Sequence, residues 1–240
     1  MIRIQNIPLP LDADPALLRK KAARLLNLKP DSILELRLAR QSIDARKKSE
    51  VHYVCTVDVT VADEARIMAR CRDRNISLFQ SQPYVFPPVQ RASTLPPVVT
   101  GMGPAGLFAA LFLARNGLAP IILERGRPVE ERTADVARFW ESGLLDPASN
   151  VQFGEGGAGT FSDGKLTTGT HDPRIATVFQ ALVEAGAPED ILYQHKPHIG
   201  TDVLRVVVRR LREELIALGC DVRFGHRLAG LRLRDGVLTG

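Results

Sequence analysis

Three glycines in one short segment have the spacing needed to bind a phosphate group. They are Gly101, Gly103 and Gly106, and the segment ends Gly103-Pro104-Ala105-Gly106. In a strand-to-helix connection, the first glycine permits a tight turn, the second lets the backbone approach a pyrophosphate, and the third allows close packing of helix on strand. The helix N-terminus attracts anions through its free N–H groups. The pattern predicts a dinucleotide diphosphate site, with Pro104 and Ala105 opening the helix.

A carboxylate at Glu124 supports the same interpretation. It closes an apolar stretch 18 residues after Gly106, near the spacing of about 20 residues expected for an acid that accepts hydrogen bonds from ribose hydroxyls. Its charge would repel a ribose phosphate, which disfavours NADP. Arg125 and Arg132 follow and are candidates to reach the diphosphate, with a solvated surface role as the equal alternative. These residues alone do not decide between NAD and FAD.

A second glycine-rich segment lies between Gly154 and Gly164. It contains five glycines, more than one turn requires, and the polar residues among them are short or charged. Glycine lets a backbone lie close to another molecule, so we expect a ligand to pass beside this segment. A purely structural glycine loop is the alternative.

The elements around these motifs are predicted to alternate between strand and helix. Residues 97–100 form a short buried strand, residues 105–116 a helix closed by Gly117, and residues 119–124 a second strand, which together make a right-handed parallel crossover. Further helices are expected at residues 173–185 and 202–218. Strands are expected at 221–224 and 228–234, followed by a turn at Asp235-Gly236.

The first 86 residues predict a separate small domain. Residues 2–5 alternate, Asp14 caps a helix over residues 16–26, and residues 33–38 are extended. Residues 51–61 keep strict period-two alternation, residues 62–74 form an amphipathic helix, and residues 78–86 are extended. The order βαββαβ indicates a ferredoxin-like α+β domain. Prolines over residues 87–97 predict a stiff, extended linker.

The composition is that of a soluble globular protein. The 240 residues are 45% hydrophobic and 25% charged, and the net charge of +5 arises in the first third, which favours two domains. The scattered cysteines Cys55, Cys71 and Cys220 predict neither a disulfide framework nor a metal site. We expect no signal peptide, no membrane span and a cytoplasmic location.

The motifs taken together resemble a known group of flavoproteins. Gly101-x-Gly-Pro-Ala-Gly-Leu, followed by Leu123-Glu-Arg-Gly, is similar to the FAD signature of glutathione-reductase-like proteins. More narrowly, the segments 150–166 and 197–202, with the leading segment 42–48, resemble the bacterial FAD-dependent, or NAD(FAD)-utilising, dehydrogenase family. Such proteins are about twice as long. The resemblance implies an incomplete Rossmann-like FAD-binding domain over residues 98–240, truncated at its C-terminus.

The resemblance also implies roles for particular residues. In such flavoproteins a glycine-rich segment runs past the pyrophosphate toward the flavin ring. The matching cofactor contacts are Gly156, Gly157, Gly159, Thr160 and Ser162. Lys165 would offset charge on the reduced flavin, or else be a solvated lysine. Leu228 would lie on a strand that offers backbone groups to adenine. No catalytic residue is assigned.

The resulting hypothesis is an FAD-dependent oxidoreductase acting on an unidentified small molecule, with NAD(P)H as the candidate electron donor. This chain alone is expected to be inactive, and its oligomeric state is not predicted. One alternative is a flavin-fold enzyme of another class, such as a tRNA-modifying or thiazole-forming protein. Another is a non-catalytic nucleotide- or RNA-binding module. Nucleic acid is disfavoured because Tyr53 is the only aromatic residue near the basic Arg40–Lys48 cluster.

Overall fold

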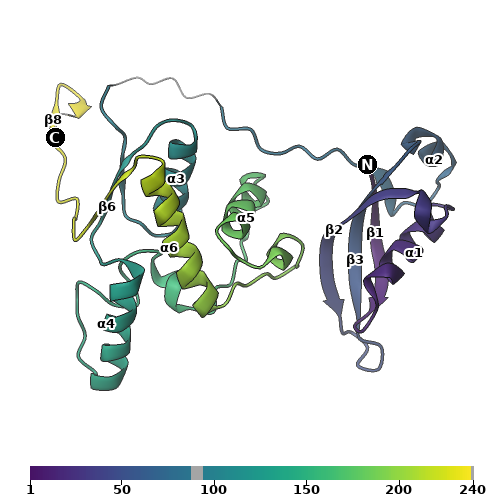
Figure 1. The fold of residues 1–240 in the computed structure, drawn as a ribbon, viewed down its shortest axis with the longest axis horizontal. Helices are drawn as coiled ribbons and strands as arrows, with labels where there is room; N and C mark the ends of the chain where they lie inside the picture. Colours follow the sequence, from purple (N-terminus) through teal and green to yellow (C-terminus); the bar gives the residue numbers. More distant parts are fainter. Residues whose placement is uncertain (88–93, 239–240) are drawn as a thin grey trace. The chain divides into compact units, whose positions relative to one another are not determined.

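A computed structural model of the chain describes residues 1–87 and 94–238 (Figure 1). It contains two compact units, each with its own sheet. The first unit comprises Met1–Tyr84, Leu166–Gln180 and Pro188–Pro197, and the second comprises Val85–Lys165, Ala181–Ala187 and His198–Gly240. Most of the expected linker over residues 87–97 lies outside the described residues. Residues 94–97 belong to no helix or strand.

The first unit is built on a four-stranded antiparallel sheet. Its strands lie in the order β2-β3-β1-β4, and all three neighbouring pairs are antiparallel. The strands are β1 (Ile2–Pro10), β2 (Ile33–Asp44), β3 (His52–Val61) and β4 (Ile76–Leu78). The helices are α1 (Pro15–Leu25) and α2 (Glu64–Arg70), with a 3₁₀ turn η1 (Pro30–Ser32) between α1 and β2. The βαββαβ order predicted from the sequence is confirmed.

Alternating apolar residues supply the core of this unit. Along β3, Cys55, Val57 and Val59 are fully buried, as period-two alternation requires. In β1 the alternation shifts phase at Asn6, which has a φ of 58° and coincides with a break in the pairing with β3. This bulge lets Ile4 and Ile7, three residues apart, both face the core.

Two elements of the first unit are shorter than predicted. The helix expected over residues 62–74 is α2, which ends at Arg70. Beyond it the Asp73 carboxylate accepts a hydrogen bond from the Asn75 amide at 2.8 Å, and such a local turn competes with helix. The extended segment expected at residues 78–86 shares only Leu78 with the observed strand β4, which pairs with β1 over Ile76–Leu78.

The second unit contains a three-stranded parallel sheet. Its strands β5 (Val98–Thr100), β6 (Ile121–Glu124) and β7 (Asp221–Phe224) lie in the order β5-β6-β7. Helix α3 (Pro104–Arg115) connects β5 to β6, and α6 (Thr201–Ala217) precedes β7. In Figure 1 both helices lie on the same side of this sheet. The predicted strand-helix-strand unit is therefore present, and the strand over 221–224 is confirmed.

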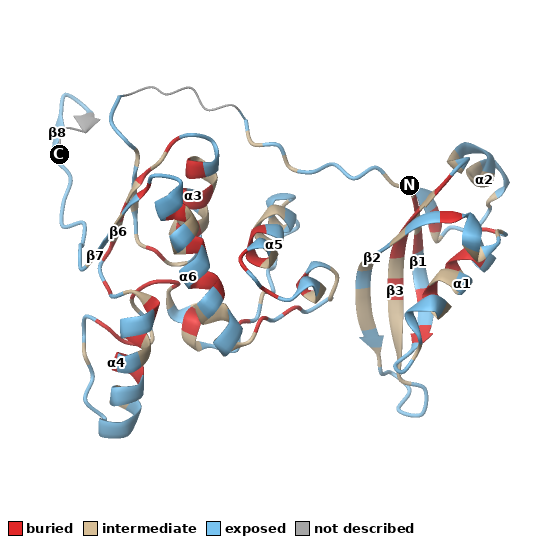
Figure 2. Cartoon of the chain, viewed as in Figure 1, coloured by how far each residue is buried: buried red, intermediate tan, exposed pale blue. Residues whose placement is uncertain are grey.

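The remaining elements of the chain are short or lie between the strands. They are α4 (Val129–Ser142), the 3₁₀ turn η2 (Ala158–Phe161), α5 (Arg174–Glu184), the 3₁₀ turn η3 (Glu189–Leu192), β8 (Leu233–Arg234) and β9 (Val237–Leu238). The hairpin of β8 and β9 turns at Asp235 and Gly236, both with positive φ, as the sequence predicted. Figure 2 shows that buried residues gather along the facing sides of the helices and strands within each unit.

Candidate functional site

The first glycine segment connects β5 to α3 in a tight turn. Gly101 has a φ of +88°, a conformation that favours glycine, and its N–H donates to the Leu123 carbonyl of β6 at 2.7 Å. Gly103 is the N-cap of α3, and Pro104 is the first helical residue. Gly103 itself has no side chain that could cap this end of the helix. The first turn of α3 therefore keeps the backbone geometry that attracts anions.

The glycines of this turn are needed for different reasons. A Cβ at Gly106 would lie 1.9 Å from the Gly101 carbonyl oxygen, so no larger residue fits there. A Cβ at Gly103 or Gly101 would meet no atom within 4 Å. Gly106 thus allows the close approach of α3 to the turn, whereas Gly103 faces open space in front of the helix.

Glu124 lies at the end of β6, beside this turn, and is only 4% exposed. One carboxylate oxygen accepts the Met102 N–H at 2.6 Å, and the other accepts the Gly126 N–H at 2.8 Å. The sequence predicted a ribose contact for this residue. In the structure its carboxylate fixes the glycine turn, and a ribose would have to share oxygens that already accept two hydrogen bonds.

The second glycine segment lies directly against the first. The Gly156 N–H donates to the Met102 carbonyl at 2.8 Å. A Cβ at Gly157 would lie 3.2 Å from Pro104 Cδ and 3.4 Å from Gly103 Cα. Two motifs separated by some fifty residues in the sequence are thus brought together at the start of α3.

The polar residues predicted in this segment have different environments. Thr160 is fully buried, and its hydroxyl donates to the Glu155 carbonyl at 3.2 Å. Its hydroxyl is therefore used inside the loop, which corrects the predicted cofactor contact. A Cβ at Gly159 would meet nothing within 4 Å. Ser162 is exposed, and its hydroxyl donates to the Gly159 carbonyl at 2.9 Å. Lys165 is exposed and pairs with Asp163 at 2.9 Å.

The two candidate arginines also differ. Arg125 is exposed, and its guanidinium lies 3.9 Å from the centre of the Phe153 ring. Arg132 is fully buried and donates to three backbone carbonyls. Burial lowers the pKa of Arg132 to about 10, while the carboxylates of Glu124 and Glu155 oppose this shift. The predicted direct contact of Arg132 with a diphosphate is corrected to a contact with the second glycine segment, because its donors already have acceptors.

Leu228 does not lie on a strand. Residues 226–232 have no strand pairing, and Leu228 is 45% exposed. The strand predicted over residues 228–234 is reduced to β8, whose only partner is β9. The segment that contains Leu228 has no neighbouring strand to pair with. The prediction that Leu228 lies on a strand was therefore wrong.

A buried carboxylate at Glu155 was not singled out from the sequence. One of its oxygens accepts the Val129 N–H at 2.7 Å, which caps α4, and also the Arg212 guanidinium at 2.9 Å. Its other oxygen has no hydrogen-bond partner among the described residues. Burial raises the pKa of Glu155 to about 7. The nearby carboxylates of Glu130 and Glu124 add to this rise, whereas the Val129 N–H and Arg212 oppose it.

Arg212, the partner of Glu155, lies in helix α6. Its side chain is only 13% exposed, and it also pairs with Glu130 at 2.6 Å. The sequence signal for this ion pair was Glu155, a charged residue among glycines. Its partner Arg212 lies 57 residues away, so local sequence patterns could not predict the pair.

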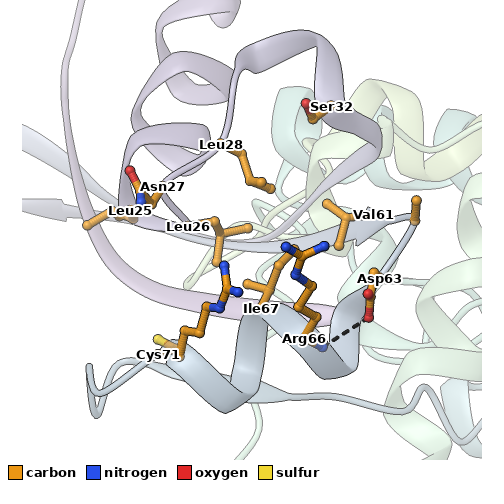
Figure 3. Close-up of a pocket in the computed structure, with 12 residues that line it drawn as sticks. Leu25, Leu26, Asn27, Leu28, Ser32, Val61, Asp63, Arg66, Ile67 and Cys71 are labelled. Atoms are coloured by element: carbon orange, nitrogen blue, oxygen red, sulfur yellow. Dashed lines mark hydrogen bonds between the residues drawn. The ribbon is translucent and has the colours of Figure 1, made fainter.

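A separate pocket of about 460 Å³ lies in the first unit, between the end of α1 and α2 (Figure 3). Its lining includes the apolar side chains of Leu26, Leu28 and Ile67, and Arg66 lies beside them in Figure 3. Arg70 also lines the pocket. Among the described residues, no group of three or more His, Cys, Asp and Glu side chains is arranged to hold a metal ion. No helix within the same residues has the length and apolar character needed to cross a membrane.

Two comparisons with known proteins bear on the chain. A family model described as "Domain of unknown function (DUF8436)" matches residues 1–60. The chain is also similar to an "Uncharacterized protein" of Clostridium beijerinckii, with 44% identity over 246 residues. That match covers 99% of this chain and 45% of the relative, so the chain spans less than half of the relative's length. Neither description names a cofactor or a reaction.

Proposed function

We propose that this chain is the FAD-binding part of a flavin-dependent oxidoreductase. The observation that carries the proposal is the junction at Gly103, where an uncapped helix start faces open space and the second glycine segment lies alongside. A diphosphate needs such a backbone surface, because a side chain would keep the phosphate oxygens away from the amides. The residues present fit this requirement.

The arrangement of the second sheet supports a Rossmann-like assignment. Read from β7 through β6 to β5, the parallel strands follow the order 3-2-1 of a mononucleotide-binding half, with the glycine turn after strand 1. The first unit, with its βαββαβ order and antiparallel sheet, supports the ferredoxin-like interpretation.

FAD is favoured over other dinucleotides for two reasons. The carboxylate of Glu124 beside the glycine turn would repel a ribose phosphate, which argues against NADP. The second glycine segment extends the backbone surface beyond the first turn, and its residues resemble those of FAD-dependent dehydrogenases. NAD(P)H as electron donor and a small-molecule substrate complete the proposal.

When bound, FAD would supply hydride transfer, and the chain would supply binding and orientation. The start of α3 would hold the diphosphate. Glu124 would keep the turn in place through the Met102 amide and could share an oxygen with the ribose. Gly159 and Ser162, which lie at the solvent-accessible side of the second segment, would border the path toward the flavin.

The proposal is tested by the visible absorption spectrum of the purified full chain, followed by identification of the nucleotide released on denaturation. Oxidised flavin bands and released FAD are expected. A colourless protein that stays colourless after incubation with FAD would refute the proposal. Because this chain alone is expected to be inactive, a substrate-free NADH oxidation assay is made on a protein of the relative's full length. There it separates a dehydrogenase from a flavoprotein that does other chemistry.

A further inference from the structure

Arg132 is the largest side chain in the fully buried set and carries a charge. Its Nε donates to the Asn150 carbonyl at 2.8 Å, Nη1 to the Glu155 carbonyl at 2.7 Å and Nη2 to the Val151 carbonyl at 2.7 Å. All three guanidinium nitrogens are therefore bound to the backbone that leads into the second glycine segment. Burying this charge is tolerated because each nitrogen has an acceptor.

The hydrogen bond to Glu155 links the guanidinium to the first glycine turn. The carbonyl of Glu155 belongs to the same peptide group as the Gly156 N–H, and that N–H donates to the Met102 carbonyl at 2.8 Å. The Met102 N–H in turn donates to Glu124. One continuous series of hydrogen bonds thus runs from Arg132 through Gly156 to the turn that precedes α3.

The packing around Arg132 shows that the loop is shaped to this side chain. Gly154 has a φ of +112°, and a Cβ there would lie 2.7 Å from Arg132 Cδ. The Phe161 ring lies 4.7 Å from the guanidinium carbon on another side. Glycine at position 154 is therefore favoured both by its positive φ and by the close approach of the Arg132 stem.

We propose that Arg132 is a positioning residue, which holds the second glycine segment against the first before any dinucleotide binds. The inference rests on the proposed function for the identity of the ligand. A site that is already assembled loses less conformational entropy on binding, so affinity rises without any new contact to the ligand. Arg132 itself reaches the ligand only through the backbone that it supports.

The geometry requires arginine rather than lysine. A guanidinium presents donors in a fixed planar fork, which can meet three carbonyls at once. Lysine has a shorter side chain that ends in a single ammonium group. It would keep the charge but could not donate to the carbonyls of Asn150, Val151 and Glu155 together. Arg132→Lys therefore separates the loss of the fork from the loss of charge.

The test compares Arg132→Lys with the control Arg138→Lys in the full chain. Arg138 lies on the same helix, α4, and is 59% exposed in an ion pair with Asp135. Hydrogen–deuterium exchange of the peptide containing Gly156 reports the loop in the absence of ligand, and a fluorescence titration gives the Kd for FAD. We expect Arg132→Lys to speed exchange in this peptide at least tenfold and weaken FAD binding at least tenfold. Arg138→Lys should stay within about twofold of the wild type in both.

A second variant keeps the test decisive where lysine disturbs folding. In Arg132→Ala, added guanidinium ion should occupy the vacated space and restore both slow exchange and FAD affinity, whereas sodium at the same ionic strength should not. If the wild type binds FAD, but Arg132→Lys and Arg138→Lys show equal exchange rates and equal Kd values, the role of Arg132 is overturned while the proposed function stands. Wild-type protein that binds no FAD would instead overturn the proposed function.

Discussion

Replacing Gly103 by valine should weaken dinucleotide binding at least about tenfold without unfolding the chain. Gly103 has φ and ψ of −71° and −178°, an extended conformation open to any residue. A Cβ at this position meets no atom within 4 Å. The new side chain would therefore occupy only the open space in front of α3, where the proposed diphosphate binds.

The expected magnitudes follow from this geometry. Valine is a poorer N-cap than glycine, which costs about 1 kcal/mol of folding free energy or less. Preventing close approach removes hydrogen bonds from backbone amides to a charged phosphate, each contributing about 1.5–3 kcal/mol. Loss of one such bond raises the Kd for FAD at least about tenfold, and loss of two raises it at least about 100-fold.

The matched comparison is Gly106→Ala, three residues further on. Its Cβ would lie 1.9 Å from the Gly101 carbonyl oxygen, which belongs to the backbone and cannot move without distorting the turn. We expect this smaller substitution to lower the free energy of unfolding by more than about 3 kcal/mol. Urea unfolding followed by circular dichroism, with FAD titration of each variant, measures both effects.

The opposite pattern would refute the reasoning. Gly103→Val that binds FAD like the wild type would show that no diphosphate approaches this turn. Gly106→Ala with wild-type stability would show that the close contact between α3 and the turn is not required.

Three further predictions concern buried carboxylates. Glu124→Gln should lower the free energy of unfolding by about 1–3 kcal/mol in urea, because one of two buried backbone amides loses its acceptor; unchanged stability would contradict this role. The pKa of Glu155 is raised to about 7 from 4.5 by burial, so the folded state holds its proton more tightly than the unfolded state. The free energy of unfolding should therefore fall by up to about 3 kcal/mol as pH rises from about 4.5 to 7. Unfolding measured over a pH series should show this fall in the wild type. The variant Glu155→Gln, which keeps an acceptor for Arg212, should not show it. Asp58→Asn should destabilise the first unit, since Asp58 is 1% exposed and its oxygens bind Arg3 at 2.7 and 2.8 Å; thermal unfolding with no shift would argue against this.

Local sequence patterns predicted most of the regular elements. Period-two alternation located β3, and the capping residue Asp14 located the start of α1, where its carboxylate accepts the Ala16 N–H at 2.7 Å. The Asp235-Gly236 pair located the final hairpin. These signals succeed because turn and cap geometry depend on neighbouring residues.

Side-chain roles at the site were harder to predict, because they depend on distant partners. Arg132 looked like a residue available to an anion, but carbonyls 18 to 23 residues away bind it. The role of Glu155 was not predicted because its two partners, the Val129 N–H at the start of α4 and Arg212, lie in distant segments of the sequence. Leu228 was misassigned because an apolar alternation says nothing about whether a neighbouring strand exists.

The spacing of the glycines was informative in a different way. The packing role predicted for Gly106 agrees with its close contact to the Gly101 carbonyl, because this requirement comes from the covalent geometry of a strand-turn-helix. The approach of a pyrophosphate to Gly103 stays a prediction. The contact between the two glycine segments, through Gly156 and Met102, required the folded structure.

The most direct test of the central claim is a calorimetric titration of the full chain with FAD, NAD and NADP under identical conditions. The account predicts that FAD binds at least tenfold more tightly than NAD, and that NADP binds most weakly because of the Glu124 carboxylate. Tighter binding of NAD or NADP than of FAD, or no binding of any dinucleotide, would contradict it.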